Sequence, residues 1–424
     1  MYLKIFVKIK EKLNCGPLTT EGAVFIQIFA LIKTKMNRKL QLLVFFFAIG
    51  NFLFSQTPTL TENAKVSVIT CASGDALYSA FGHTAFRVQD TALGIDVVYN
   101  YGTFDFEQPN FYLNFTKGKM IYSLSRRSFE AFLYEYELEK RWVKEQILDL
   151  TVAQRNQLLL FFEENYLPEN RDYLYDPLLN NCSSITGDIL KEQFGDAIVF
   201  DGSYLEKQYT FRQLVRQFLD MNSWSMFGID LAFGSPVDRK ATVQEHMFLP
   251  YYTMEQLRHT TFNGKPIVQR ERTILDYNEH LQRGFFPLSP LFWFILLLAF
   301  TGIITYFDFK HKARSRWLDF SLLFITGLAG TFLFLLWVAA DHTSTPYNYN
   351  ILWAFPINLI VSFTLLFQDK VPQWSPKYFM FALGLMAIML LLWILKVQIF
   401  SPVLIPLLLT LAIRYVYLIR YSKL

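Results

Sequence analysis

Five apolar stretches in the last third of the chain restrict its fold more than any other feature. Each has close to the roughly 20 residues that an α-helix needs to cross a bilayer, and they lie at about 288–307, 317–340, 350–368, 378–397 and 400–418. The loop at residues 310–316 is strongly basic, whereas the loop at residues 341–350 has no Lys or Arg. Because basic loops stay in the cytoplasm, we expect residues 286–424 to form an all-α transmembrane bundle of five helices whose loop 341–350 lies outside.

The N-terminal residues indicate export of the domain that follows them. Arg38 and Lys39 precede an apolar run at residues 40–50, and this order is typical of a signal peptide. Residues 36–55 are therefore interpreted as a signal peptide or N-terminal anchor, residues 1–35 as an upstream extension before a start at Met36, and residues 56–285 as an exported domain. This reading agrees with the topology that the loop charges predict.

The composition excludes one class of function. The chain is 52% hydrophobic and 18% charged, and its net charge is only +4. Its basic residues form no run of the kind that binds nucleic acid, so a nucleic-acid partner is excluded. No cluster of His, Cys, Asp and Glu has the spacing of metal ligands, so we expect neither a metal nor another cofactor.

Residues 56–285 have the pattern of an α+β domain. Strands are expected at residues 65–70, 84–88 and 95–101, with a turn at 90–94 that joins the last two. Helix starts are indicated by three capping boxes, Thr151 with Gln154, Thr210 with Gln213, and Thr242 with Glu245. A further helix is expected to begin at Cys182 and to end before Gly195. The predicted fold is an antiparallel sheet with helices packed on one side.

His83 and Cys182 are the candidate catalytic pair of this domain. Cys182 lies where a loop turns into a helix, and the positive end of the helix dipole favours the thiolate there. A neighbouring imidazole can take the thiol proton, which is the arrangement used in covalent acyl catalysis. The alternative for His83 is a hydrogen-bonded histidine of the core.

A residue on the second strand of the predicted hairpin should orient the His83 ring through its other nitrogen. The candidates are Asn100, Tyr99, Tyr101 and Asp105. A register shift of one residue exchanges the side chains that face His83, so the choice stays open, with Asn100 preferred.

Polar residues around Cys182 suggest further contacts. Asn180 and Asn181 are the candidates to cap the helix, and the backbone N–H groups of Cys182 and Ser183 are expected to form an oxyanion hole. Arg171 precedes this turn, and it has two interpretations, a contact to substrate or a structural ion pair.

Several motifs together resemble a known family. They lie at residues 71–75, 81–88, 98–106, 168–171, 181–183, 235–239 and 247–250, and in the membrane segment at His342 and residues 350–353. They are similar to the signature of the lipoprotein N-acyltransferases that have an Lnb N-terminal periplasmic domain, followed by an Lnb-like transmembrane domain. The resemblance covers nearly all of the chain from about residue 60 onward.

A second, less specific resemblance concerns the order of the two catalytic residues. A His that precedes a helix-opening Cys is similar to the circularly permuted papain-like folds of the NlpC/P60 and lecithin:retinol acyltransferase groups. The exported domain is therefore expected to be α+β and papain-like, of the permuted NlpC/P60 kind.

The first resemblance implies an acyltransferase of the inner (cytoplasmic) membrane with its catalytic domain on the periplasmic side. The implied reaction moves a fatty acyl chain from a phospholipid to the α-amine of a diacylglyceryl-cysteine on a lipoprotein, with Cys182 as nucleophile and His83 as general base. Tyr101, Asp105, Arg171, Asn181 and Ser183 are candidate substrate or oxyanion contacts. His342, in the outer loop, is expected to help position the headgroup or the acceptor, although the loop could equally be a solvated connection.

Two other functions remain open at this stage. An exported NlpC/P60-like cysteine peptidase or amidase would act on cell-wall peptide, although such an enzyme would not need five membrane spans. A membrane-anchored binding or assembly factor would instead have Cys71 and Cys182 joined in a disulfide, as exported cysteines often are.

Overall fold

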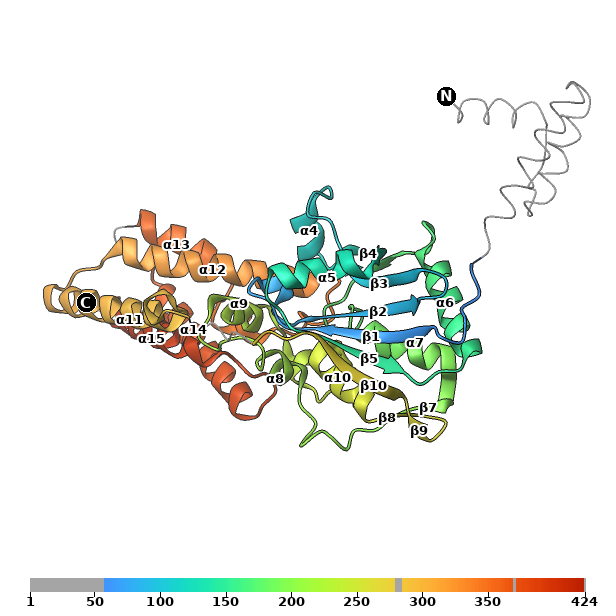
Figure 1. Cartoon of the computed structure of the whole chain (residues 1–424). Helices are drawn as coiled ribbons and strands as arrows, with labels where there is room; N and C mark the ends of the chain where they lie inside the picture. Colours follow the sequence, from blue (N-terminus) through green and yellow to red (C-terminus); the bar gives the residue numbers. More distant parts are fainter. Residues whose placement is uncertain (1–56, 279–283, 369–370, 423–424) are drawn as a thin grey trace, which may run out of the picture. The chain divides into compact units, whose positions relative to one another are not determined.

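The computed structural model describes residues 57–278, 284–368 and 371–422. Residues 60–424 form one compact unit, in which an N-terminal domain of strands and helices (residues 60–278) precedes a helical membrane block (residues 284–422), as Figure 1 shows. The expected extension at residues 1–35 and the expected signal peptide at 36–55 lie outside the described residues, and both stay predictions.

A seven-stranded antiparallel sheet forms the centre of the N-terminal domain, in the order β10-β5-β1-β2-β3-β4-β6. A smaller sheet has the order β7-β8-β9. The strands are β1 (Lys65–Cys71), β2 (His83–Asp90), β3 (Ile95–Thr103), β4 (Ile121–Ser128), β5 (Val143–Leu148), β6 (Asp172–Leu174), β7 (Ile198–Phe200), β8 (Thr260–Phe262), β9 (Lys265–Pro266) and β10 (Val268–Leu275). The antiparallel sheet that the sequence predicts is therefore present.

Helices cover both faces of the large sheet, so the expectation of helices on one side only is wrong. Leu158 of α6 (Val152–Tyr166) and Ile189 of α7 (Ser184–Phe194) pack in the larger core. On the other face, Phe132 of α5 (Phe129–Leu138) packs against Cys71 of β1. The reason lies in β1, whose residues are all buried after Lys65. A strand that is buried on both faces requires cover on both.

The predicted helix ends agree with the structure at most positions. The capping boxes of Thr151 and Thr210 are both formed and begin α6 and α8 (Phe211–Val215). Gly195 has φ +57° and ends α7. The third box is also formed, since Thr242 and Glu245 exchange hydrogen bonds of 2.8 and 3.2 Å, but it begins a short 3-10 helix (Gln244–Phe248). The remaining helices of this domain are α4 (Phe111–Thr116), α9 (Trp224–Ala232) and α10 (Pro250–Arg258).

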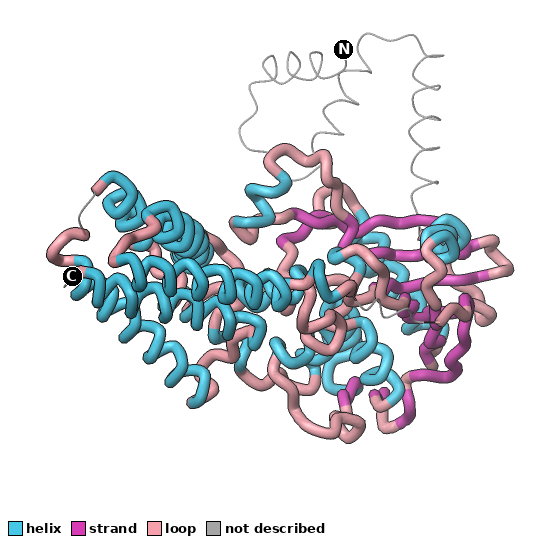
Figure 2. Tube along the Cα trace, turned by 90° about the vertical axis from the view of Figure 1, so that its left-hand side faces the viewer, coloured by secondary structure: helices cyan, strands magenta, loops and turns pink. Residues whose placement is uncertain are grey.

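Four helices among the described residues of the membrane block are long and apolar enough to cross a bilayer. They are α11 (Pro290–His311), α12 (Arg316–Val338), α14 (Ser375–Ile394) and the segment Pro402–Tyr421, which contains α15 (Ile405–Tyr421). Figure 2 shows the long helices of this block running beside one another. The chain therefore has a mixed α/β N-terminal domain followed by a helical region with four candidate membrane spans.

The third expected span, residues 350–368, is interrupted. It consists of a 3-10 turn (Tyr349–Leu352) and the ten-residue helix α13 (Asn358–Phe367). A β-carbon on Gly330 of α12 would overlap the carbonyl oxygen of Ala354, and one on Gly327 would overlap the backbone of Leu359. The irregular backbone between the two pieces is thus packed directly on α12, where non-helical chain is tolerated at membrane depth. A bundle of five complete crossing helices stays a prediction.

Buried polar contacts join the N-terminal domain to the outer loops of the membrane block. The side chain of Arg212 is buried, and it donates to Asp230 and Asp238 across 2.9 Å each. Asp238 in turn accepts from the backbone of Ile399, in the loop before α15, across 3.1 Å. Asn348, in the loop after α12, donates to the carbonyl oxygens of α9 residues Leu231 and Ala232. Both outer loops are therefore bonded to the N-terminal domain.

Candidate active site

The turn before β2 and the turn before α7 bring His83 and Cys182 together. Gly82 precedes His83 with φ +85°, and a β-carbon there would lie 2.7 Å from the carbonyl oxygen of Cys71. Gly102 in β3 has φ +88°, and its β-carbon would lie 3.1 Å from Cβ of Cys182. Both glycines adopt backbone conformations that other residues rarely take. Gly82 allows the turn before β2 to lie against Cys71, and Gly102 allows β3 to lie against Cys182.

Asn100 orients the His83 ring. Its Oδ1 lies 2.5 Å from Nε2 of His83, which leaves Nδ1 for the hydrogen bond to the Cys182 thiol. The β2–β3 register pairs Phe86 with Tyr99, and successive side chains of β3 point to opposite faces. Tyr99 and Tyr101 accordingly reach α6, where the Tyr99 hydroxyl donates to Glu163 and the Tyr101 hydroxyl accepts from Asn165. The structure thus resolves the open register in favour of Asn100.

The surroundings of the pair favour its charged form. Burial raises the pKa of the Cys182 thiol, but the charge of His83, its hydrogen bond and the backbone N–H of Thr84 outweigh burial, so that the pKa lies below its ordinary value. Burial lowers the pKa of His83, whereas the charge and hydrogen bond of Cys182 and then the hydrogen bond of Asn100 raise it above its ordinary value. Opposite shifts of this kind favour a thiolate beside an imidazolium.

A chain of hydroxyl groups links the residues that follow His83 and Cys182. Thr253 of α10 donates to the carbonyl oxygen of Met247 across 2.7 Å. A hydroxyl has one proton to donate, so Ser183 must donate to Thr253 (2.7 Å) and Thr84 must donate to Ser183 (3.2 Å). All three side chains are buried. The chain therefore holds the start of β2 against the turn that carries Cys182.

Asn181 has the capping role that the sequence predicts. Its Oδ1 accepts from the backbone N–H groups of Ser183 and Ser184 at 2.8 and 2.9 Å, and its Nδ2 donates to the carbonyl oxygens of Pro177 and Phe248. The N–H of Ser183 is therefore already occupied, and its expected role in an oxyanion hole is wrong for this arrangement. The N–H groups of Thr84 and Cys182 face the sulfur instead.

The other predicted site residues lie apart from the pair. Tyr101 is buried beneath α6. Asp105 is exposed and accepts from the backbone of Glu107 across 2.8 Å, as a turn residue does. Arg171 has an exposed side chain 4.0 Å from Asp172, and both of its interpretations stay predictions. His342 donates from Nε2 to the carbonyl oxygen of Phe115 in α4 across 2.7 Å.

Three tyrosines stand close enough to Cys182 to sense its charge. Burial first and the Cys182 charge second raise the pKa of Tyr122 to about 12. Burial and the same charge also raise the pKa values of Tyr173 and Tyr175. The rings of Tyr122 and Tyr175 are in contact, with centroids 3.9 Å apart. Nothing in the sequence distinguishes these residues, because isolated tyrosines in and beside strands are usual in any core.

Both cysteines of the described chain are free thiols, and Cys71 is buried. Burial raises the pKa of Cys71 to about 12, so this thiol stays protonated. Cys71 of β1 lies opposite His83 of β2 in the strand register. The disulfide between Cys71 and Cys182 that a binding or assembly factor would have is therefore absent from this structure.

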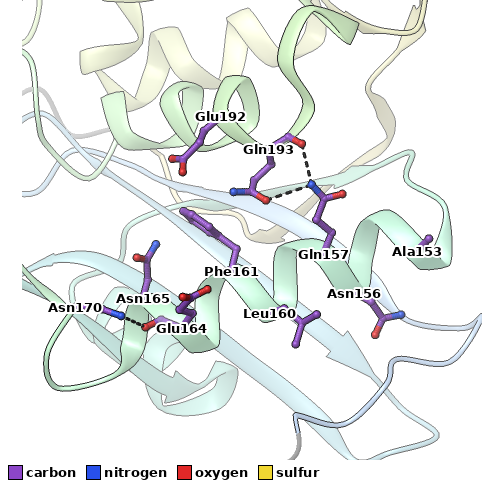
Figure 3. A pocket seen from close by; sticks show the side chains of 10 residues that line it. All are labelled: Ala153, Asn156, Gln157, Leu160, Phe161, Glu164, Asn165, Asn170, Glu192 and Gln193. Carbon is purple, nitrogen blue, oxygen red and sulfur yellow. Dashed lines mark hydrogen bonds between the residues drawn. The ribbon is translucent and has the colours of Figure 1, made fainter. Parts of the chain in front are cut away.

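A polar cleft between α6 and α7 is separate from this site. Figure 3 shows its lining, which includes Gln157, Asn165, Glu192 and Gln193, and it has a volume of about 750 Å³. Glu192 lies near the end of α7, roughly 12 Å along the helix from the residues that follow Cys182. The cleft is thus no part of the catalytic arrangement.

Two family models match the chain. One is described as the Lnb N-terminal periplasmic domain and covers residues 57–217, and the other is described as the Lnb transmembrane domain and covers residues 281–424. The first range includes His83, Asn100 and Cys182, and the second includes His342. No curated protein and no solved structure matches the chain, so the papain-like permuted topology stays a prediction. The two models indicate a membrane-associated enzyme that modifies lipoproteins. The chain belongs to the Lnb family, as a multi-pass membrane protein in which an Lnb N-terminal periplasmic domain precedes an Lnb transmembrane domain.

Proposed function

We propose that this protein is a lipoprotein N-acyltransferase of the inner membrane that works through an acyl-thioester on Cys182. The observation that carries the proposal is the hydrogen-bonded group of Cys182, His83 and Asn100 in a domain bonded to the outer loops of the membrane block. A thiolate in that position suits attack on an ester, and the neighbouring membrane supplies esters as phospholipids.

The first half-reaction forms the thioester. The Cys182 thiolate attacks the carbonyl carbon of a phospholipid ester, and the N–H groups of Thr84 and Cys182, which face the sulfur, donate to the developing oxyanion. The bond from that carbon to the glycerol oxygen then breaks. The His83 imidazolium gives its proton to the departing alkoxide, so that a lysophospholipid leaves with a neutral hydroxyl.

The second half-reaction transfers the acyl chain to the lipoprotein. The free α-amine of a diacylglyceryl-cysteine attacks the thioester carbonyl, and neutral His83 accepts the proton that the amine loses. The carbon–sulfur bond breaks, and the Cys182 thiolate and the His83 imidazolium are restored. Thioesters suit this step because amines open them readily and a thiolate of lowered pKa is a good leaving group.

The test is the intact mass of the full-length protein after incubation with phospholipid vesicles. We expect one added acyl chain on Cys182, no adduct on the Cys182→Ala variant, and retention of the adduct on Cys71→Ala, which also removes one thiol. Mass spectrometry of a lipoprotein substrate should show N-acylation by the unmodified enzyme and by Cys71→Ala, but not by Cys182→Ala. Undiminished N-acylation by Cys182→Ala and His83→Ala would exclude the proposed chemistry.

A cysteine peptidase or amidase is the second candidate, because Cys, His and Asn in this arrangement also suit hydrolysis of a peptide bond. The two functions differ in what reaches the thioester, water or a lipoprotein amine. Incubation of the full-length protein with cell-wall peptides distinguishes them. New amino termini that require Cys182, without any N-acylated lipoprotein, would favour the peptidase.

A further inference from the structure

Large apolar side chains gather on the exposed surface of α4 and the turns beside it. We call this surface the apolar patch, and it consists of Leu77, Tyr78, Phe106, Tyr112, Leu113 and Phe115. Tyr112 is 77% exposed and Tyr78 is 64% exposed, while the other four are about half exposed. The rings of Tyr78 and Phe106 are in contact, with centroids 6.1 Å apart. A contiguous group of exposed aromatic residues indicates a binding surface.

The apolar patch lies at the outer end of a membrane helix. The backbone N–H of Asp341 donates to Lys117 across 2.8 Å, and His342 donates to Phe115 across 2.7 Å. These two residues follow closely on Val338, the last residue of α12, and Figure 1 shows α4 beside that end. Val338 is itself 58% exposed, so the lipid-facing surface of α12 continues to its outer end. The patch therefore lies beside the end of a candidate membrane span.

The composition around the apolar patch is that of a membrane interface. Tyrosine and phenylalanine occur beside two exposed lysines, Lys117 and Lys119, and aromatic rings with basic residues are typical of the headgroup region. Lys119 also forms an ion pair of 3.4 Å with Asp341, which adds a third contact between this segment and the membrane block. A soluble protein partner would not require this continuity with α12.

An aromatic cluster connects the apolar patch to Cys182. The cluster consists of Phe104, Phe111, Met120, Tyr122, Tyr173 and Tyr175. On the patch side, the rings of Phe106 and Phe111 have centroids 5.0 Å apart. On the thiol side, Phe104 contacts Tyr122 at 5.0 Å, and Tyr122 contacts Tyr175 at 3.9 Å. Gly102, two residues before Phe104, lies so near the thiol residue that a β-carbon on it would be 3.1 Å from Cβ of Cys182.

We propose that the apolar patch inserts into the outer leaflet of the membrane and that the aromatic cluster behind it forms the path by which an acyl chain reaches Cys182. The segment at residues 104–119 is then a membrane-binding element of the periplasmic domain, additional to the transmembrane helices. The insertion itself does not depend on the proposed acyl transfer, whereas the role of the cluster rests on it.

The insertion is tested with a nitroxide spin label on the full-length chain in vesicles of phosphatidylethanolamine and phosphatidylglycerol. The label is attached to Tyr112→Cys in a background with Cys15→Ser and Cys182→Ser, because Cys71 is buried. The matched control is Leu160→Cys, which is 55% exposed on α6 at the end of the sheet away from the membrane helices (Figure 1). Collision rates with oxygen and with a water-soluble nickel chelate are measured by electron paramagnetic resonance.

A label at Tyr112 should collide several-fold more with oxygen than with the nickel chelate, and the label at Leu160 should show the opposite preference. A preference for the nickel chelate at both positions would overturn the proposal and identify the patch as water-exposed or as a contact for a protein. The same measurement at Leu113→Cys guards against a defect of one variant.

The path is tested separately by Tyr122→Trp, which should slow adduct formation on Cys182 several-fold without changing the label result. An unchanged rate would exclude the path but not the insertion.

Discussion

The hydroxyl of Thr343 donates to Oδ2 of Asp176 across 2.7 Å. Thr343 belongs to an outer loop of the transmembrane domain, and Asp176 begins the turn that leads to Cys182. The other oxygen of Asp176 accepts from the backbone N–H groups of Leu178 and Leu179, both at 2.9 Å. The membrane domain thus supports the turn that places the candidate nucleophile.

Replacement of Thr343 by Val should slow N-acylation roughly two- to tenfold, because one exposed hydrogen bond contributes roughly 0.5–1.5 kcal/mol to the position of the turn. Rates are measured by mass spectrometry of a lipoprotein substrate at equal protein abundance. Thr343→Ser keeps the hydroxyl and should retain the original rate. Equal rates for Thr343→Val and the original protein would show that Asp176 holds the turn without the loop.

The pH dependence of Cys182 alkylation should reveal its lowered pKa. The thiolate is present above that pKa, so the rate of alkylation by iodoacetamide should fall only when the pH falls well below the ordinary thiol value of 9.0. In His83→Ala the charge and hydrogen bond that lower the pKa are lost while burial remains, so the curve should move to higher pH. The raised pKa of His83 sets the upper pH limit of the thiolate–imidazolium pair, because the imidazolium loses its proton above that pKa. Coincident curves for the two proteins would contradict the thiolate–imidazolium pair.

Asn100→Ala should lower the rate of N-acylation roughly tenfold, the effect of losing one hydrogen bond of about 1.4 kcal/mol to the imidazolium. The upper pH limit of activity should also move to lower pH, because the Asn100 bond raises the pKa of His83. A merely structural loss would reduce activity equally at every pH. Tyr101→Phe, on the opposite face of β3, should leave the pH profile unchanged.

Arg212→Ala should destabilise the protein by roughly 3–5 kcal/mol, because it leaves Asp238 buried without its cation and Asp230 paired with Arg216 alone. The measurement is thermal unfolding of the purified full-length chain. Arg239→Ala is the matched control, since its ion pair with Glu245 is partly exposed and should contribute at most about 1 kcal/mol. Similar losses in both variants would show that the buried network has no special role in joining the two domains.

Gly330→Ala should lower the abundance of folded protein in the membrane, because the added methyl group would overlap the carbonyl oxygen of Ala354 and separate α12 from the interrupted third span. Gly302→Ala is the control, as its β-carbon would have no neighbour within 4 Å. Quantitative blotting of membrane fractions checks both. Normal abundance of Gly330→Ala would mean that the two segments are packed less closely than described.

Local chemistry made part of this structure predictable from the sequence. Thr151 and Gln154 specify a helix start by themselves, and the turn at residues 90–94 specifies the β2–β3 hairpin. The hairpin could not identify the partner of His83, because the choice between Asn100 and Tyr101 depends on register, which the packing of Tyr99 and Tyr101 against α6 decides.

Contacts between distant segments explain what the sequence could not reveal. Arg212, Asp230 and Asp238 look like ordinary surface charges in the sequence, and only folding brings them together. Thr253, which ends the hydroxyl chain from Thr84, lies 70 residues from its partner Ser183. The interrupted third span was missed for a related reason, since its composition is apolar and the glycines of α12 that accommodate the break lie elsewhere in the chain.

Asn348 of the membrane block is hydrogen-bonded to the N-terminal domain, and Asp238 of the N-terminal domain is hydrogen-bonded to the membrane block. These two bonds affect where a substrate can meet Cys182. A domain on a flexible tether would sample different distances from the bilayer, whereas this N-terminal domain is hydrogen-bonded to two separate loops of the membrane block. We therefore expect Cys182 to stay at one height relative to the membrane helices. The phospholipid ester and the lipoprotein amine would then each have to reach that height. A lipid whose reacting group lies deeper or shallower in the membrane would be excluded as a substrate.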